Sequence, residues 1–421
     1  MIKKRKSKIT GAFLGTVVEY YDYSLYGFSA GILATKFFPG VDKISSLMYV
    51  FAIYALSYLA KPFGSLFFSN IGDIYGRKTS LHITMIGIVI PTLIIGILPE
   101  YNSIGVLSTY ILIICRFFQG FFTAGEYDGA AIYVIEHLGK KHHYTASAIT
   151  RATGVAGLLL GIASTNFFNS SVFPDWGWRI PFLLSVPLAM IAMYFRQFLE
   201  ETPDFLESKK QQMEFHNVLS FIRKRWLTLI CVIFLAGGFG ATYQVSIIFM
   251  KQYLPMIVPY THQIITTFSV VIVMVFGIAM LISGFLADRF GCVIVVKYSL
   301  LSSLVSCLLM IISIHYQLMN LTLVACLLLA ISVAPFNGLA HGVIIKAFRT
   351  NERYRGVGLG HTTGSMLMSG PTNYICLWFM RKFEWQLFPI FYVGLFAFLT
   401  YFMVIIFTKN ADSSLKKRCS S

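Results

Sequence analysis

The chain has 421 residues, of which 56% are hydrophobic, 16% aromatic and only 12% charged, and its mean hydropathy is +0.70. So apolar a composition excludes a soluble globular protein, because much of this surface has to face lipid. Basic residues in alternate loops carry most of the net charge of +16. This pattern is typical of loops that lie against anionic lipid and argues against a nucleic-acid-binding surface.

Apolar runs long enough to cross a hydrocarbon core of about 30 Å, which takes ~20 helical residues, occur twelve times along the chain. The first six predicted spans are 10–38, 47–68, 80–98, 106–136, 146–168 and 180–199. The second six are 227–253, 264–287, 293–314, 321–347, 356–379 and 385–407. Backbone groups left unpaired in lipid are costly, so runs of this length have to be helices. We therefore predict an all-α membrane protein with twelve transmembrane helices in two pseudo-symmetric six-helix bundles.

A hydrophilic stretch divides the two groups of spans. It covers residues 200–226 and is rich in Lys, Glu and Gln. The predicted organisation is an N-terminal six-helix bundle at 1–199, a cytosolic linker at 200–226, and a C-terminal six-helix bundle at 227–421 that ends in a short cytosolic tail.

A similar loop pattern follows the second span and the eighth. It reads GDIYGRK at 72–78 and GFLADRFG at 284–291, and its symmetric placement indicates duplication of a six-helix unit. Although such loops can be mere tight turns, these two lie where the bundles can touch in only one conformation. We therefore expect them to control the conformational change and not substrate affinity. The predicted gating residues are Asp73, Gly76, Arg77, Asp288 and Arg289.

Basic residues also set the predicted orientation, because Lys and Arg are enriched in cytosolic loops. With the N-terminus in the cytosol, the outside loops carry only Lys36, Lys43, Arg381 and Lys382. Both termini are then cytosolic. We expect a multi-pass protein of the cytoplasmic (inner) membrane.

Short motifs in a fixed order carry a family resemblance over nearly the whole chain. They are EYYDYSLYG at 19–27, KPFG at 61–64, GDIYGRK at 72–78, GEYDGA at 125–130, WGWRIPF at 176–182 and ETPDF at 201–205. This series resembles the major facilitator superfamily, and within it the metabolite:proton symporter branch, which includes proline/betaine permeases and citrate, α-ketoglutarate and shikimate carriers. The resemblance implies a central substrate site, alternation between outward-open and inward-open states, and proton-coupled uptake.

The first span places two carboxylates and two phenols on one helical stripe. Glu19, Asp22, Tyr23 and Tyr26 follow each other at i, i+3, i+4 and i+7, and we expect this stripe to face the cavity. The helix rise puts Asp22 at the depth of Arg116 in the fourth span, and such a pair occurs in related symporters. A permanent structural ion pair is the alternative. The predicted proton-coupling residues are Asp22, Glu19, Arg116 and Glu126. Glu126 is included because it matches the acidic residue of the GEYDGA motif in the resembling family.

Polar residues within the spans are the candidates for the substrate site. The predicted cavity residues are Tyr23, Tyr26, Lys61, Gln119, Arg151, Tyr243, Gln244 and Asn337. For Glu126, and for the polar residues of the second half, bonding between packed helices is the alternative. Asp128 and Arg151 depart from the resembling family and lie at one depth, so we predict that they pair, with substrate binding by Arg151 as the alternative.

No phosphate loop, metal-ligand cluster or nucleophile elbow occurs in the sequence, so we expect no enzymatic activity, no cofactor and no metal. The expected partners are a small-molecule substrate, a proton and the lipid bilayer, with no nucleic acid and a monomer as the functional unit. The leading prediction is symport of a small polar metabolite such as proline or betaine. A citrate-like or dicarboxylate anion, clamped by Lys61, Arg116 and Arg151, is the rival substrate. A transporter-like sensor without flux is the distant alternative.

Overall fold

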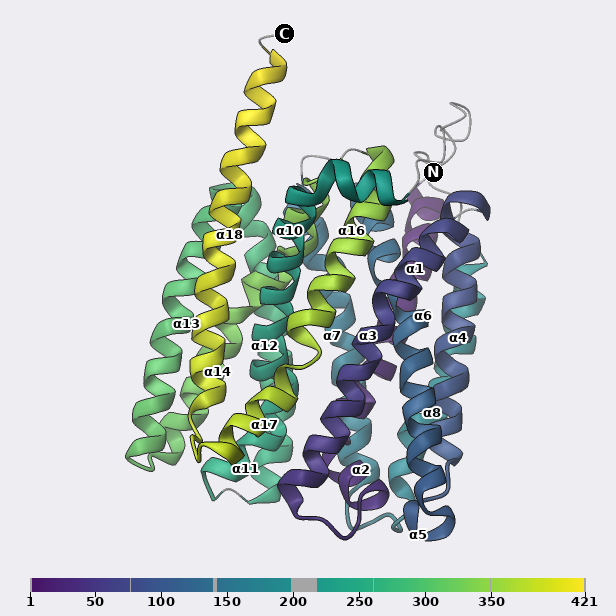
Figure 1. Ribbon diagram of the computed structural model, residues 1–421, viewed down its shortest axis with the longest axis vertical. Coiled ribbons are helices and arrows are strands. Elements are labelled where there is room, and N and C mark those ends of the chain that lie inside the picture. The colour runs from purple at the N-terminus through teal and green to yellow at the C-terminus, as the bar shows by residue number, and fades with distance from the viewer. Residues whose placement is uncertain are drawn as a thin grey trace.

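The computed structural model describes residues 2–75, 77–138, 142–197, 218–259, 261–348 and 350–419. All secondary structure in these ranges is helical. The long helices stand side by side in an elongated bundle, and both chain termini lie at one end of it (Figure 1). We call this end the terminal end and the other the opposite end.

The first half of the chain supplies six long helices and three short ones. They are α1 (Ile2–Phe28), α2 (Ala30–Phe37), α3 (Lys43–Tyr75), α4 (Arg77–Ile97), α5 (Tyr101–Ile104), α6 (Val106–Leu138), α7 (His143–Phe168), η2 (Gly177–Arg179) and α8 (Ile180–Arg196). The short α2, α5 and η2 lie at the opposite end, where they connect the long helices.

The second half repeats this plan with two irregular spans. Its elements are α10 (Val218–Tyr243), η3 (Gln244–Phe249), α11 (Met250–Ile257), α12 (His262–Phe290), α13 (Cys292–His315), α14 (Met319–Gly338), α15 (Ala340–Ile345), α16 (Thr350–Gly364), η4 (Ser365–Ser369), α17 (Thr372–Lys382) and α18 (Phe388–Cys419). The segments η3 and η4 are π-helical. Such wide turns are rare and often mark functional sites.

The predicted spans coincide with the long helices. Ten helices are long and apolar enough to cross a membrane within the part of the chain that the structure describes. The other two predicted spans, 10–38 and 356–379, are helical as well. The multi-pass membrane fold is thereby confirmed. Most of the predicted linker, 200–226, lies outside the described residues, so the division into domains stays a prediction.

The helices of each half pack mainly on one another, and two helix pairs make the most extensive contacts between the halves. Within the first half α1 packs on α7 and α3 on α6, while α13 packs on α14 and α10 on α16 in the second. Between the halves, α7 packs against α12 and α3 against α16.

Glycines on α7 allow it to approach α1 closely. A Cβ added to Gly157 would lie 2.1 Å from the carbonyl oxygen of Val17, and one added to Gly161 would lie 2.0 Å from the Ser24 hydroxyl. Small residues let helix backbones come together in a membrane, where helix contacts are driven by packing. This contact fixes the position of α1, which carries several residues of the site.

We predict that Gly157→Ala destabilises the protein and Gly31→Ala does not. The new methyl group at 157 meets a backbone carbonyl, and overpacking of this kind costs about 1–3 kcal/mol. Nothing lies within 4 Å of a Cβ built on Gly31, so this helical glycine is the matched control. The thermal midpoint of monodisperse protein in detergent should fall for the first variant alone. Equal midpoints would show that the α1–α7 contact is looser than described.

Candidate functional site

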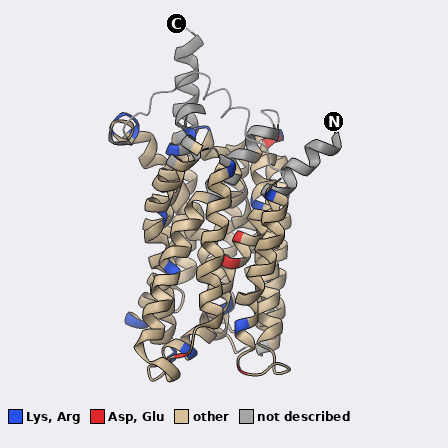
Figure 2. Ribbon diagram, turned by 90° about the vertical axis from the view of Figure 1, so that its right-hand side faces the viewer, with Lys and Arg blue, Asp and Glu red and all other residues tan. Residues whose placement is uncertain are grey.

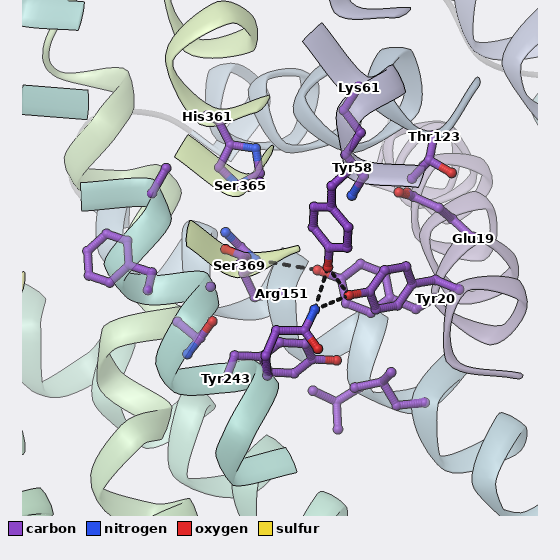
Figure 3. A pocket seen from close by; sticks show the side chains of 18 of the residues that line it. Glu19, Tyr20, Tyr58, Lys61, Thr123, Arg151, Tyr243, His361, Ser365 and Ser369 are labelled. Atoms are coloured by element: carbon purple, nitrogen blue, oxygen red, sulfur yellow. Dashed lines mark hydrogen bonds between the residues drawn. The ribbon is translucent and has the colours of Figure 1, made fainter. Parts of the chain in front are cut away.

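A cavity lies between the two halves and is lined by residues of both (Figure 3). Its volume is about 80 Å³. The lining comes from α1, α3, α6 and α7 of the first half and from α10, η3, α12, α14, α16 and η4 of the second. A ligand in this cavity would therefore touch both halves at once.

The cavity contains most of the residues that the sequence predicts for it. Tyr23, Lys61, Arg151, Tyr243, Gln244 and Asn337 all line it. Tyr26 and Gln119 do not. Tyr26 is fully buried and donates to the Val50 carbonyl at 3.2 Å, and Gln119 bonds to side chains of α4 and α6 within the first half. Tyr26 lies at the far end of the predicted stripe on α1, beyond the cavity, and it therefore packs inside the bundle.

Other lining residues were not predicted, among them Tyr20, Tyr58, Thr123, Ser365 and Ser369. Tyr58 could have been found, since it precedes Lys61 by three residues and shares its helical face. The two serines lie in the π-helical η4. A π-turn changes which side chains face inward, and no sequence pattern announces it.

Gln244 connects the second half to a cluster of tyrosines in the first. Its Nε2 lies 2.6 Å from the Tyr23 hydroxyl, 2.5 Å from that of Tyr58 and 3.2 Å from that of Tyr54. The hydroxyls of Tyr23 and Tyr58 also bond to each other. An amide nitrogen carries two hydrogens, so the three hydroxyls share them. The rings are therefore held in fixed positions against the cavity.

Two cations cover the faces of these rings. Lys61 Nζ lies 4.2 Å from the ring centroid of Tyr58 and 5.4 Å from that of Tyr23. The guanidinium carbon of Arg116 lies against two other tyrosines, 4.2 Å from the Tyr26 centroid and 5.2 Å from that of Tyr54. Aromatic faces attract cations, most strongly where water is excluded.

Arg151 provides a second cationic group in the cavity. Its Nε donates to His341 Nδ1 at 3.0 Å, which links α7 to α15 of the other half. Its Nη1 lies 3.5 Å from the Tyr20 hydroxyl. The side chain of Asp128 lies outside the described residues, so the predicted Asp128–Arg151 pair stays a prediction. The charged residues that line the cavity in the described part of the chain are Glu19, Lys61 and Arg151.

The predicted ion pair between Asp22 and Arg116 is absent. Arg116 donates to Gln119 Oε1 at 2.8 Å and to the Ser57 hydroxyl at 3.3 Å, and neither oxygen of Asp22 has a hydrogen-bond partner. Asp22 faces a small void against α4 and not the main cavity, whereas Glu19 borders both. The helix rise predicts the depth of a residue in the membrane but not the direction in which its side chain points. Figure 2 shows acidic positions halfway between the two ends of the bundle.

Of the predicted gating residues, Asp288 contacts the other half at the terminal end. Its carboxylate accepts from the backbone N–H groups of Tyr144 at 3.0 Å and Thr145 at 2.9 Å, in the first turn of α7. A carboxylate is favourable there because of the helix dipole and the unpaired N–H groups. Arg289 is exposed and stacks over Phe290. Three further predicted gating positions and one proton-path candidate cannot be placed: Gly76 and the side chains of Asp73, Arg77 and Glu126 lie outside the described residues.

The halves also touch at the opposite end, where α1 breaks at Phe28. Lys251 on α11 donates to the Phe28 carbonyl at 3.1 Å and to Asn166 Oδ1 at 2.7 Å. Nearer the surface, Arg381 on α17 bonds to Asp42 and Ser45. The hydroxyl and backbone N–H of Ser45, and to a lesser degree Arg381, hold the pKa of the Asp42 carboxyl below its usual range. Its contact with Arg381 is therefore present at neutral pH and is lost as the pH falls through that lowered pKa.

Comparisons with known proteins agree with this architecture. A model of the Major Facilitator Superfamily matches residues 12–371. The Proline/betaine transporter of Escherichia coli (strain K12) is 30% identical over 98% of this chain and 85% of its own length. The Glycine betaine/proline/ectoine/pipecolic acid transporter OusA of Dickeya dadantii (strain 3937) is 29% identical over the same shares.

Solved structures show the same fold at low sequence identity. The proton:xylose symporter XylE bound to 6-bromo-6-deoxy-D-glucose has a TM-score of 0.74 at 16% identity, over 96% of this chain and 94% of that one. The partially occluded inward-open form of the xylose transporter XylE from E. coli has a TM-score of 0.71 at 14% identity, over 96% and 97%.

We predict that Asp288→Ala speeds hydrogen exchange in the first turn of α7. Its carboxylate accepts from two backbone N–H groups there, and hydrogen bonds to a charged group are worth about 1.5–3 kcal/mol, so exchange should rise about tenfold or more. Mass spectrometry of peptides covering 143–150 measures this rate. Asp175→Ala, at the opposite end, is the control and should leave it unchanged. Unchanged exchange in both variants would mean that Asp288 does not hold the terminal end closed.

Proposed function

This chain belongs to the major facilitator superfamily, and we propose that it carries a small zwitterionic osmolyte of the proline or betaine type inward together with a proton. The observation that carries the proposal is a cavity shared by both halves and lined by charges of both signs, Glu19 against Lys61 and Arg151. A zwitterion presents one charge of each sign and suits such a lining. The relatives that match nearly the whole chain are named as transporters of proline and betaines, which supports the same substrate class.

The cavity offers a distinct partner to each end of a zwitterion. The guanidinium of Arg151 suits the carboxylate, because its planar donors match two carboxylate oxygens. The ring faces of Tyr23 and Tyr58 suit a cationic group of low hydration. Tyr243 and Phe276 add aromatic surface to the lining of the cavity.

Alternating access would proceed by rocking of the two predicted bundles, 1–199 and 227–421, about this cavity. Polar contacts join the halves at both ends, and each end includes one made by a charged side chain to backbone groups of the other half. Asp288 with the first turn of α7 would separate when the terminal end opens. Lys251 with the carbonyl at the α1 break would separate when the opposite end opens. A ligand that touches both halves would favour whichever state lets both close on it.

Proton coupling is proposed to use the carboxylates of α1. Asp22 is 3% exposed, and its carboxylate makes no hydrogen bond within the part of the chain that the structure describes. An ionised carboxylate is strongly unfavourable in such a place, so the protonated form fits this conformation. Glu19 borders both the Asp22 void and the substrate cavity, so it offers the proton a route between them. Glu126 stays a second candidate on the path, and Arg116 would act through its positive charge.

Orientation and assembly complete the proposal. The terminal end is assigned to the cytosol of the inner membrane because basic residues predominate in the loops on that side. The opposite end then faces outward, and the substrate enters there. The chain is proposed to work as a monomer, with the bilayer, the substrate and the proton as its partners. A carrier of this kind changes no covalent bond, so it would release the substrate unaltered.

A citrate-like or dicarboxylate anion is the second candidate substrate. The observation that favours it is the excess of cations among the charged lining residues, since Lys61 and Arg151 could each bind one carboxylate. A transporter-like sensor that binds the ligand without flux is the remaining alternative. These possibilities differ in what crosses the membrane.

Uptake into proteoliposomes tests the proposal. We expect radiolabelled glycine betaine and proline to accumulate inside when a proton gradient is imposed, to be recovered chemically unaltered, and to be released by a protonophore. Accumulation of citrate or succinate in their place would establish the rival substrate. Saturable binding of any of these compounds without flux would indicate a transporter-like sensor.

We predict that Asp22→Asn uncouples transport from the proton gradient. Each proton moved through 100 mV supplies about 2.3 kcal/mol, enough for roughly fiftyfold accumulation, and the amide cannot exchange that proton. Exchange of external for internal substrate should persist, because Asp22 does not line the substrate cavity. If the variant still accumulates substrate against its concentration gradient, Asp22 does not have this role.

A further inference from the structure

The cavity already contains a cation at the place where a substrate cation would bind. Lys61, Tyr58 and Tyr23 all line it, and the ammonium of Lys61 lies against both rings, 4.2 and 5.4 Å from their centroids. Lys61 and Tyr58 extend from the same helix, α3, into the cavity (Figure 3). The lysine and a ligand ammonium would compete for the same ring faces.

The geometry of the rings makes them a rigid receptor for a cation. The Tyr23 and Tyr58 rings lie 6.3 Å apart at an interplanar angle of 75°, so their faces form a corner. Both hydroxyls bond to Gln244, which prevents the rings from turning away. The neighbouring Tyr26 and Tyr54 face Arg116, which is 2% exposed and buried in the first half. Of these two cations, only Lys61 lines the cavity and can be displaced by a ligand.

We propose that the ammonium of Lys61 stands in for the cationic group of the substrate in the empty cavity, and that a secondary or quaternary ammonium displaces it from Tyr58 and Tyr23. The inference rests on the proposed function, and it identifies the cationic group of the substrate as the feature that the protein recognises. The carboxylate of the same zwitterion lies toward Arg151, and Glu19 in the same cavity offers the displaced lysine a partner of opposite charge.

The exchange favours a substrate cation because of the difference in hydration. A primary ammonium is compact and strongly hydrated, and its four-carbon stem lets it move to another partner. A quaternary ammonium has no N–H donors and loses little when water is excluded, which is why aromatic cages bind such groups. Lysine therefore keeps the ring faces occupied without blocking them.

This role makes the effect of Lys61 depend on the class of ligand. Lys61→Met removes the competing charge but keeps an apolar stem, so glycine betaine should bind more tightly. A dicarboxylate would instead lose a cationic partner and bind more weakly. The two candidate substrates are thus expected to respond in opposite directions to one substitution.

Calorimetric titration of the full chain in nanodiscs tests this with three probes. They are glycine betaine, 3,3-dimethylbutyrate, which has the same shape and carboxylate but an uncharged end, and succinate. The wild-type protein should prefer betaine to the uncharged analogue by about 2- to 30-fold, the range expected for a cation on an aromatic face. Lys61→Met should widen that preference and weaken succinate. Tyr58→Leu should abolish most of the preference, and Tyr58→Phe, which keeps the ring, should retain it.

Lys346→Met is the matched control, because Lys346 lies 4.1 Å from the Tyr144 centroid, outside the cavity. It should leave the ratio of the two affinities unchanged. Wild-type protein that binds betaine no better than its uncharged analogue, or a Lys61→Met variant that loses betaine, overturns the inference and leaves the proposed function intact. If succinate binds and no zwitterion does, or if no probe binds, the proposed substrate class fails and the inference fails with it.

Discussion

The rest of the structure depends on one constraint, that a polar group inside a membrane-spanning bundle has to find its partner in the protein. The fully buried amide of Gln244 meets it by sharing its hydrogens among three tyrosine hydroxyls of the other half. This cluster connects the halves where their surfaces would otherwise only touch. It also fixes the rings whose faces form part of the cavity wall.

The same constraint decides how charge is distributed. Arg116 is buried without a carboxylate, and its charge is offset by two tyrosine faces, the Gln119 carbonyl and the Ser57 hydroxyl. Among the described residues, no cation lines the small void that Asp22 faces, and this void is separate from the main cavity. Charges that neutralise each other permanently could not take up and release a proton. In the proposed mechanism, the separation of this acid from this base keeps the Asp22 carboxylate available to take up and release a proton.

The sequence predicts the helices well because an apolar run of about 20 residues has one stable form in lipid. It also predicts Lys61 and Arg151, since charged residues inside such runs are rare and usually face a cavity. It could not give the direction of each side chain. Tyr26 and Gln119 share a face with cavity residues yet pack inside the first half, and the π-helical η4 presents Ser365 and Ser369 to the cavity without any signal in the sequence.

The central claim is that a zwitterion binds between the halves with its cationic end on the tyrosine corner. Arsenobetaine, in which arsenic replaces the nitrogen of glycine betaine, allows that end to be located by anomalous diffraction from a crystal of the complex. The account predicts one arsenic peak in the cavity, within about 6 Å of the ring centroids of Tyr58 and Tyr23, with Lys61 moved away from them. A peak elsewhere in the molecule, or one beside Arg151 with Lys61 still on Tyr58, would contradict it.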